Sequence, residues 1–222
     1  MGITACIFDL DGVIVDTARY HFLAWKRLAD QLGINFTLED NERLKGVSRM
    51  ASLEIILEIG KKKLDEDQKQ RYATLKNEWY IEYISKMTPD EILTGSVQFI
   101  REVRAAGIRT AIGSASKNTP MILERVDIRD LFDAVADGNI ISKAKPDPEV
   151  FLKAADLLAI SPSECVVFED AVAGIQAAIN AGMKCVGIGS PTLLGKADLV
   201  IDGLYQMNIE KLRKLNNPTP NE

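Results

Sequence analysis

Two pairs of acidic residues each close an apolar, β-prone run of the chain. Asp9 and Asp11 follow the run 3–8, and Glu169 and Asp170 close the run 165–170. Ligands of open α/β sheets bind beyond the carboxyl ends of the strands, and residues two apart in a strand point the same way. Carboxylates held together repel each other unless a cation neutralises them, and their oxygens suit Mg²⁺. The four acids therefore predict a magnesium site, the alternative being that each pair only ends a strand at a turn.

A polar segment and a lysine elsewhere in the chain have the chemistry to hold an anion. The segment that closes the run 109–114 and follows it consists of Ser114, Ala115, Ser116, Lys117 and Asn118. With Asn118 as the N-cap of a helix and Pro120 in its first turn, the segment predicts a phosphate-binding loop, unless it is an ordinary polar connection. Lys145 precedes Pro146, which restricts the lysine backbone. Its ammonium group can pair with the carboxylates or with a phosphate, or Lys145 is a surface residue.

The elements that must position these residues alternate between strand and helix from about residue 93 onward. Continuous apolar runs, typical of strands covered on both faces, occupy 3–8, 109–114, 165–170, 184–189 and 198–201. Helical patterns lie at 97–107, 120–125, 148–158 and 171–181. This alternation predicts right-handed βαβ units, so the fold class is α/β with a doubly wound, mostly parallel sheet.

Residues 17–88 have a different character, because three amphipathic patterns follow one another with no strand-like run between them. The first ends at Gly33, the second begins with Ser48 as a helix cap and ends at Gly60, and the third runs from Tyr72 to about Thr88. We therefore predict an all-helical insertion, called the cap (residues 16–91), in an α/β core formed by 1–15 and 92–222. The links at 13–16 and 88–93 are predicted hinges.

Composition and charge exclude several classes of partner and of protein. The formal net charge is −5, from 32 acidic and 27 basic residues, so no nucleic-acid or membrane partner is expected. No apolar run approaches the roughly 20 residues that span a bilayer, and the first residues lack the pattern of a signal peptide. The absence of a Gly-x-x-x-x-Gly-Lys-Ser/Thr motif excludes a P-loop kinase. The cysteines lie in apolar runs and fit no zinc set, so we expect buried thiols in a cytoplasmic protein; they are Cys6, Cys165 and Cys185.

In their order and spacing, these residues resemble the four motifs of the haloacid dehalogenase-type phosphotransferases, and the inserted helical cap fits that pattern too. The matching motifs are Asp9-Leu10-Asp11-Gly12-Val13, Ser114, Lys145-Pro146 and Glu169-Asp170. The resemblance implies a Rossmann-like core, Asp9 as the nucleophile that accepts a phosphoryl group, and Asp11 as the general acid and base. It implies phosphate binding by Ser114 and Lys145. It further implies that Mg²⁺ is held by Asp9, the backbone carbonyl of Asp11, Glu169 and Asp170.

Segments 16–25, 45–49 and 114–118 are similar to the sugar-phosphomutase branch of that family. Ser48 at a helix start turns the backbone N–H groups of 46–48 toward the positive helix end, and Arg49 adds a guanidinium suited to phosphate. Such a segment can also be purely structural. The resemblance implies interconversion of β-D-glucose 1-phosphate and D-glucose 6-phosphate through an aspartyl phosphate and β-D-glucose 1,6-bisphosphate. The phosphate that is not transferred would lie between Arg49 and the segment 116–118.

The remaining candidate residues follow from the same resemblance. His21, the only histidine, would organise the substrate and Asp11 with Lys76 as a companion, although a partly buried structural histidine is the alternative. Thr17 lies at the first hinge, and Trp25 is more readily part of the cap core than a platform for a sugar. The substrate-binding set is completed by Lys45, Gly46, Val47, Ser48 and Ser52.

The chain departs from the family pattern at Ala171, where related sequences often carry Ser, and in the segment 36–41. Two other functions stay open: a sugar-phosphate phosphatase of the same family that uses water as acceptor, and a catalytically silent sugar-phosphate-binding protein. Intact Asp9, Asp11, Lys145 and Asp170 count against the silent protein. We expect a monomer that acts on small sugar phosphates.

Overall fold

A six-stranded, wholly parallel sheet forms the centre of the protein in a computed structural model that describes residues 2–45 and 47–215. The strand order is β3-β2-β1-β4-β5-β6. The strands are β1 (Ala5–Phe8), β2 (Arg109–Gly113), β3 (Ala134–Ala136), β4 (Cys165–Glu169), β5 (Lys184–Ile188) and β6 (Leu199–Ile201). The predicted α/β class with a parallel sheet is confirmed, and β1 lies in the middle, where its carboxyl end adjoins that of β4.

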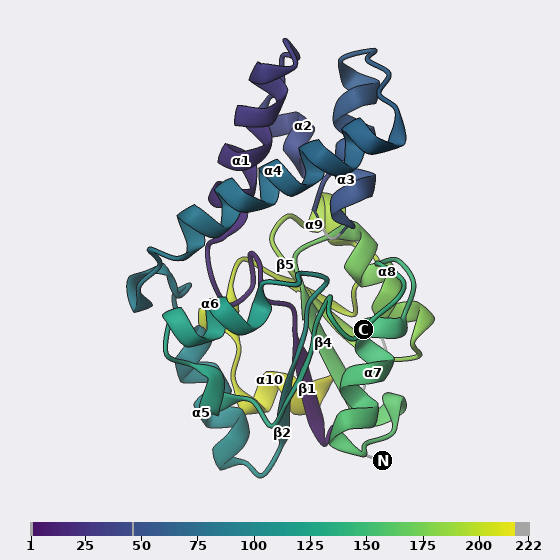
Figure 1. Cartoon of the computed structure of the whole chain (residues 1–222). Coiled ribbons are helices and arrows are strands. Elements are labelled where there is room, and N and C mark those ends of the chain that lie inside the picture. The colour runs from purple at the N-terminus through teal and green to yellow at the C-terminus, as the bar shows by residue number, and fades with distance from the viewer. Residues whose placement is uncertain (1, 46, 216–222) are drawn as a thin grey trace.

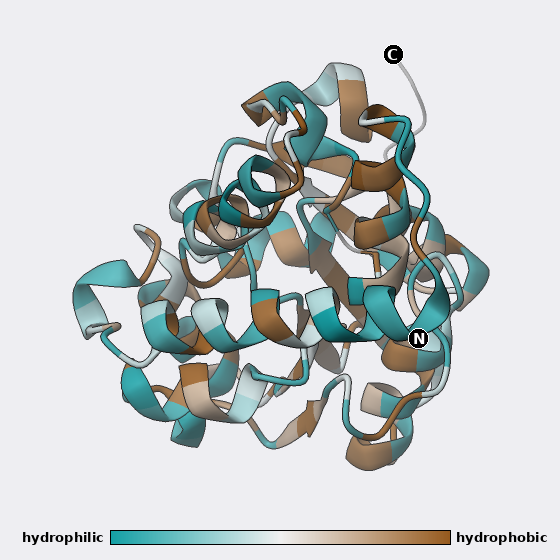
Figure 2. Cartoon of the chain, turned by 45° about the horizontal axis from the view of Figure 1, so that its top comes forward, coloured by the Kyte–Doolittle hydropathy of each residue, from teal (hydrophilic) through white to brown (hydrophobic). Residues whose placement is uncertain are grey.

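Helices cover both faces of the sheet (Figure 1). They are α5 (Ser96–Ala105), α6 (Thr119–Arg125), α7 (Glu149–Leu158), α8 (Val172–Asn180), α9 (Pro191–Leu194) and α10 (Ile209–Lys214). Successive residues of β1 enter opposite layers: Phe8 packs in a cluster with Phe99 of α5, and Ile7 in a cluster with Phe151 of α7. Figure 2 shows hydrophobic residues gathered on the central strands and hydrophilic residues spread over the outer helices. Burial on both faces explains why these strands are continuous apolar runs.

Four helices inserted after β1 stand beyond the carboxyl edge of the sheet (Figure 1). They are α1 (Ala18–Gln31), α2 (Leu38–Glu42), α3 (Arg49–Ile59) and α4 (Glu66–Ile84), and α4 packs along α1. Ser48 begins α3 as predicted, because its hydroxyl accepts a hydrogen bond from the backbone N of Ala51 at 3.3 Å. The cap boundaries at 16 and 91 stay a prediction. None of the helices in the described part of the chain is long and apolar enough to cross a membrane.

The two chain crossings between these helices and the sheet lie side by side. Val15 and Ile92 form an isolated antiparallel bridge, and the backbone N of Leu93 donates to the carbonyl of Ile14 at 2.9 Å. A short 3₁₀ turn, η1 (Pro89–Glu91), carries the second crossing. Side chains reinforce the pairing, since Arg19 and Tyr20 at the start of α1 both hydrogen-bond the Glu91 carboxylate.

Four elements escape the sequence prediction: strand β3 and the short helices α2, α9 and α10. Strand β3 has three residues, too few to show a strand pattern, and it forms because β2 offers an open edge beside it. Helix α2 has five residues and falls in the unmatched segment 36–41, where Thr37 and Asp40 form a capping box. Three further 3₁₀ turns are η2 (Arg129–Leu131), η3 (Pro162–Glu164) and η4 (Leu204–Gln206). The three cysteines are free and buried, as expected.

Candidate active site

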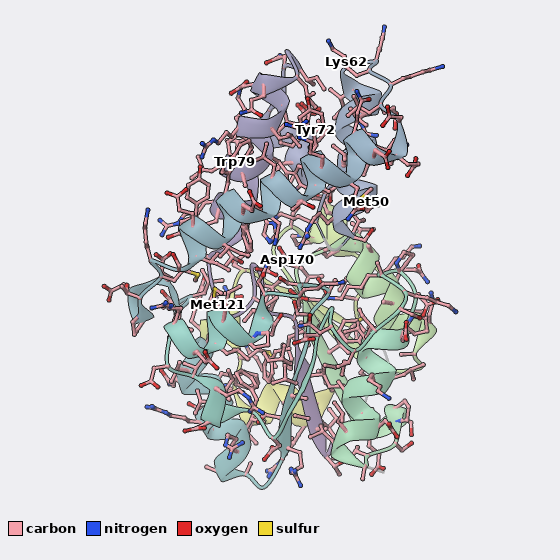
Figure 3. All side chains as sticks on the ribbon, in the orientation of Figure 1. Met50, Lys62, Tyr72, Trp79, Met121 and Asp170 are labelled. Atoms are coloured by element: carbon pink, nitrogen blue, oxygen red, sulfur yellow. The ribbon has the colours of Figure 1, made fainter. Side chains whose placement is uncertain are left out.

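A cavity of about 430 Å³ opens between the carboxyl edge of the sheet and the cap helices. Its walls combine both units, with Asp9 and Lys145 on the sheet side and His21 and Arg49 on the helical side. Asp170 lies at this junction, below α3 and α4 (Figure 3). Every predicted site residue lines the cavity except Thr17, which is buried behind it, and Gly46, which lies outside the described residues.

Three carboxylates converge where β1 and β4 end. Asp9, Glu169 and Asp170 each offer one oxygen, and these oxygens all lie within 4.8 Å of one another. Burial raises the pKa of Glu169 to about 8 and that of Asp170 to about 7, with the charge of Asp9 adding to both. Gly12 permits this approach, because its φ is +80° and a Cβ there would lie 2.3 Å from Asp170 Oδ2. The group is a candidate site for a divalent cation.

Lys145 reaches into the acidic group from the loop before α7. Its ammonium donates to Asp9 and, at 2.8 Å, to Glu169 Oε2, and its side chain is 1% exposed. The charges of Asp9 and Glu169 outweigh burial and raise the pKa of Lys145. The other oxygen of Glu169 accepts from the backbone N of Asp170 at 3.1 Å and of Ala171 at 3.0 Å. The sequence allowed Lys145 to pair with the carboxylates or with a phosphate. In the structure its ammonium group pairs with the carboxylates of Asp9 and Glu169.

Asp11 faces a different set of neighbours. Its carboxylate lies outside the group of three and accepts a hydrogen bond from the Thr17 hydroxyl. Burial, and after it the charge of Asp9, raises the pKa of Asp11 to about 6. His21 Nε2 lies 3.9 Å from Asp11 Oδ1. Asp11 therefore sits where protonated and ionised forms are both accessible near neutral pH.

Lys76 lies behind His21 in an aromatic enclosure. Its Nζ is 3.0 Å from His21 Nδ1 and lies over the rings of Trp25, at 4.6 Å, and Tyr80, at 4.7 Å. Burial, with the charge of Arg49, lowers the pKa of Lys76 to about 7. Burial also lowers the pKa of His21, and the charge of Lys76 adds to that effect. The structure thus brings together Asp11, Thr17, His21 and Lys76, and it places Trp25, 2% exposed, in the wall behind them.

The loop after β2 is a tight turn held by its own hydroxyls. The backbone N of Ser116 donates to Ser114 Oγ at 3.1 Å, and the backbone N of Asn118 donates to Ser116 Oγ at 3.2 Å. Asn118 occupies the N-cap position of α6, as predicted, but its side chain makes no capping bond. Its amide instead donates to Asn77 Oδ1 of α4 at 3.1 Å, which joins the loop to the cap.

The segment before α3 also approaches the acids. Lys45 Nζ lies 3.0 Å from Glu42 Oε2 and 3.6 Å from Asp170 Oδ2, and these charges raise the pKa of Lys45 against the effect of burial. Val47 and Ser48 line the cavity close by, and Ser52 is buried in its wall. Lys62, in the loop that follows α3, points away from the site at the tip of the cap (Figure 3).

Sequence reasoning missed several polar residues of the cavity, above all Asn77. The lining of α4 consists of Gln70, Ala73, Lys76, Asn77 and Tyr80, which recur three or four residues apart on one helical face. This spacing is the sequence signal that could have identified the cavity-lining face of α4. The loop before α7 adds Ser142 and Lys143, and α2 adds Asn41.

Comparison with known proteins matches this chain to one family over most of its length. The model of the haloacid dehalogenase-like hydrolase family matches residues 3–182. The β-phosphoglucomutase of Bacillus subtilis is 45% identical over 212 residues, which cover 95% of this chain and 94% of that protein. The crystal structure of a β-phosphoglucomutase from Clostridium difficile superposes with a TM-score of 0.92 at 43% identity and covers 97% of both chains.

Phosphatases also occur among the similar proteins. A fructose-1-phosphate phosphatase of Escherichia coli is 32% identical over 186 residues, which cover 82% of this chain and 94% of that protein. Identity is thus higher with the mutases of Bacillus subtilis and Clostridium difficile than with this phosphatase.

Proposed function

The chain belongs to the haloacid dehalogenase-like hydrolase family, and from this premise we propose that it is a phosphomutase that interconverts β-D-glucose 1-phosphate and D-glucose 6-phosphate. The observation that carries the proposal is one cavity with phosphate-binding chemistry at two places. Asp9, Ser114 and Lys145 lie at the sheet edge, and Arg49 faces Asn118 between cap and core. A mutase needs the second place because its bisphosphate intermediate has a phosphate that is not being transferred.

The acidic group fits Mg²⁺. Carboxylate oxygens are its preferred ligands. The pKa values of Glu169 and Asp170 are raised by burial first and by the charge of Asp9 after it, and a bound cation would favour the ionised form of both groups. We assign the ion to Asp9, Glu169 and Asp170, with the backbone carbonyl of Asp11 as a further ligand. Bound there, it supplies positive charge against the repulsion between a carboxylate nucleophile and a phosphate.

Asp9 and Asp11 divide the chemistry between them. A carboxylate oxygen of Asp9 forms a bond to the phosphorus of β-glucose 1,6-bisphosphate, and the bond from phosphorus to the sugar oxygen breaks. Asp11 donates its proton to that leaving oxygen. In the return step Asp11 accepts the proton of the sugar hydroxyl that attacks the aspartyl phosphate. The pKa of Asp11, raised to about 6, suits both roles.

The neighbours of these two acids hold them in place. Lys145 donates to Asp9 and directs its carboxylate, and together with Ser114 it binds the transferring phosphoryl group. Thr17 orients the Asp11 carboxylate from the start of α1, so Asp11 is correctly placed only when the cap lies against the core. His21, with Lys76 behind it, faces Asp11 and the sugar from the same helical side.

The cap and the loop after β2 hold the rest of the substrate. We assign the far phosphate to Arg49, Ser116, Lys117 and Asn118. We assign the remaining wall of the sugar site to Trp25, Lys45, Val47, Ser48, Ser52 and Ala115. Gly46, which the family resemblance adds to this set, lies outside the described residues. The units that close on the substrate are the core, 1–15 and 92–222, and the cap, 16–91. The protein acts as a monomer on small sugar phosphates.

The experiment that tests this function supplies Mg²⁺, β-glucose 1-phosphate and a trace of β-glucose 1,6-bisphosphate. Glucose 6-phosphate and free phosphate are measured over time. The proposal expects glucose 6-phosphate as the main product and no turnover without bisphosphate. Free phosphate with little isomer would instead identify a phosphatase, and no turnover of any sugar phosphate would identify a silent binding protein.

A further inference from the structure

Asn77 joins three elements that come from distant parts of the chain. It lies on α4, and its side-chain oxygen accepts from Arg49 Nη2 of α3 at 2.7 Å and from Asn118 Nδ2 at the start of α6 at 3.1 Å. Both partners are donors, so the carboxamide must present its oxygen to them. Arg49 and Asn77 lie on the cap helices and Asn118 lies at the sheet edge, so the side-chain oxygen of Asn77 links the two sides of the cavity by hydrogen bonds.

The contact with the neutral side chain of Asn77 does not neutralise the charge of Arg49. In residues 2–45 and 47–215 no carboxylate pairs with Arg49, and burial alone lowers the pKa of its guanidinium. Lys117, in the same loop as Asn118, also lines the cavity, and no carboxylate in the described part of the chain lies within ion-pair distance of it. Two cationic groups therefore line the cavity beside a neutral acceptor, which leaves a local excess of positive charge.

An amide oxygen and a carboxylate would act differently in this place. Both accept hydrogen bonds from Arg49 and Asn118, and both would fix these side chains toward each other. A carboxylate would in addition form an ion pair with the guanidinium and repel an arriving phosphate. A neutral acceptor orients the donors and keeps their charge available for an anion.

We propose that Asn77 is a positioning residue that orients Arg49 and Asn118 for the far phosphate of the substrate while leaving the charge of Arg49 available to bind it. The inference rests on the proposed function for the identity of the ligand. Asn77 itself takes no part in the transfer at Asp9.

The test compares two substitutions of similar size. Asn77→Leu removes the acceptor, and Asn77→Asp keeps both hydrogen bonds but adds a negative charge. Glu78→Gln, at the exposed neighbouring position on α4, is the matched control. Binding of β-glucose 1,6-bisphosphate to the Mg²⁺-free protein is measured by calorimetric titration. The KM and kcat are measured for isomerisation of β-glucose 1-phosphate and for hydrolysis of a small aryl phosphate, which has one phosphate.

We expect Asn77→Leu to weaken bisphosphate binding and raise the KM for isomerisation roughly tenfold, the usual effect of one lost charge-assisted contact. Asn77→Asp should weaken binding further, although it preserves the hydrogen bonds. The kcat/KM for the aryl phosphate should stay within about twofold of the native value for both variants. Glu78→Gln should behave as the native protein.

Native affinity in Asn77→Asp would overturn the inference, since it would show that only the hydrogen bonds matter. Equal fold-losses of affinity for the bisphosphate and of kcat/KM for the aryl phosphate would also overturn it, because they would indicate general damage to the cavity. Failure of the proposed function is separable: a native protein that makes no glucose 6-phosphate refutes the mutase, whereas the titration series still decides the role of Asn77.

Discussion

At the scale of single residues, two acids that lie close together in the site differ because different side chains contact them. Asp9 and Asp11 are two residues apart, yet Asp9 accepts from buried Lys145 and Asp11 accepts from Thr17 of the cap. Burial and the charge of Asp9 raise the pKa of Asp11 to about 6, which suits a group that must both give and take a proton. In the proposed mechanism, the environment, and not the residue type, separates the nucleophile Asp9 from the acid and base Asp11.

Lys76 should make stability depend on pH. Its pKa is lowered to about 7 in the fold and is 10.5 without the fold, so between these values the unfolded chain binds more protons. The free energy of unfolding therefore rises with pH across that window. Lys76→Met should be more stable than the native protein by up to about 5 kcal/mol below pH 7, with the difference vanishing toward pH 10. Urea unfolding of both Mg²⁺-free proteins from pH 6 to 10 measures this, and a pH-independent difference would contradict it.

Gly12 should be needed for the acidic group and not only for its turn. Gly12→Ala adds a left-handed backbone penalty of about 1 kcal/mol and a Cβ 2.3 Å from Asp170 Oδ2. Gly33→Ala is a matched control, since its φ is +68° and nothing lies within 4 Å of the added Cβ. Both variants carry the backbone penalty in thermal unfolding, and Gly12→Ala should lose more stability because Asp170 must shift. Only Gly12→Ala should weaken Mg²⁺ binding in calorimetric titration, and equal Mg²⁺ affinity in both would refute the argument.

At the scale of elements, the two chain crossings carry the cap on the core. The backbone N of Asp16 donates to the carbonyl of Glu91 at 3.0 Å, and Val15 pairs with Ile92. The Glu91 carboxylate accepts from Tyr20 at 2.6 Å and from Arg19. The start of α1 is thereby tied to the second crossing, so we expect the two predicted hinges to move together.

Glu91→Gln should loosen this hinge. The substitution removes the negative charge that Arg19 and Tyr20 share, at a cost of about 1 kcal/mol in the free energy of unfolding. Hydrogen exchange at the Asp16 amide should become faster than in the native protein. The exposed neighbour serves as control, since Asp90→Asn should leave this exchange unchanged. Unchanged exchange of the Asp16 amide in Glu91→Gln would show that Glu91 does not hold the two links together.

How far the sequence predicts each element depends on whether its signal is local. Strands β1, β2, β4 and β5 are continuous apolar runs because both faces are buried, and α1 shows its buried stripe, so all were predictable. Strand β3 has no signal of its own, because its pairing depends on the neighbouring β2. The contacts of Asn77 depend on how α3, α4 and α6 meet, which no local pattern encodes.

At the scale of the whole molecule, the net charge of −5 conceals a local division of charge. Acids gather at the ends of β1 and β4, whereas Arg49 and Lys117 line the opposite part of the same cavity. This division of charge fits the proposed cation site and the proposed anion site, and Lys45 Nζ lies 3.6 Å from Asp170 Oδ2 where the cap meets the core.

Mg²⁺ should stabilise the whole fold. The ion binds the folded acidic group and not the unfolded chain, so the melting temperature should rise by about 5 °C at saturating Mg²⁺ and fall back on adding EDTA. Asp170→Asn should reduce this rise, because it removes one of the three converging carboxylates. Glu164→Gln, in η3 at the opposite end of β4 from the acidic group, should show the native rise. A rise that persists in full in Asp170→Asn would place the ion elsewhere.

The most direct test of the central claim follows one phosphoryl group from Asp9 to its acceptor. The protein is mixed with Mg²⁺ and ³²P-labelled β-glucose 1,6-bisphosphate, then chased with unlabelled β-glucose 1-phosphate. The label is counted in sugar phosphates and in inorganic phosphate. We predict label on the protein that is absent from Asp9→Asn and that passes to sugar phosphates in the chase. Label released mainly as inorganic phosphate, whatever the concentration of β-glucose 1-phosphate, would contradict it.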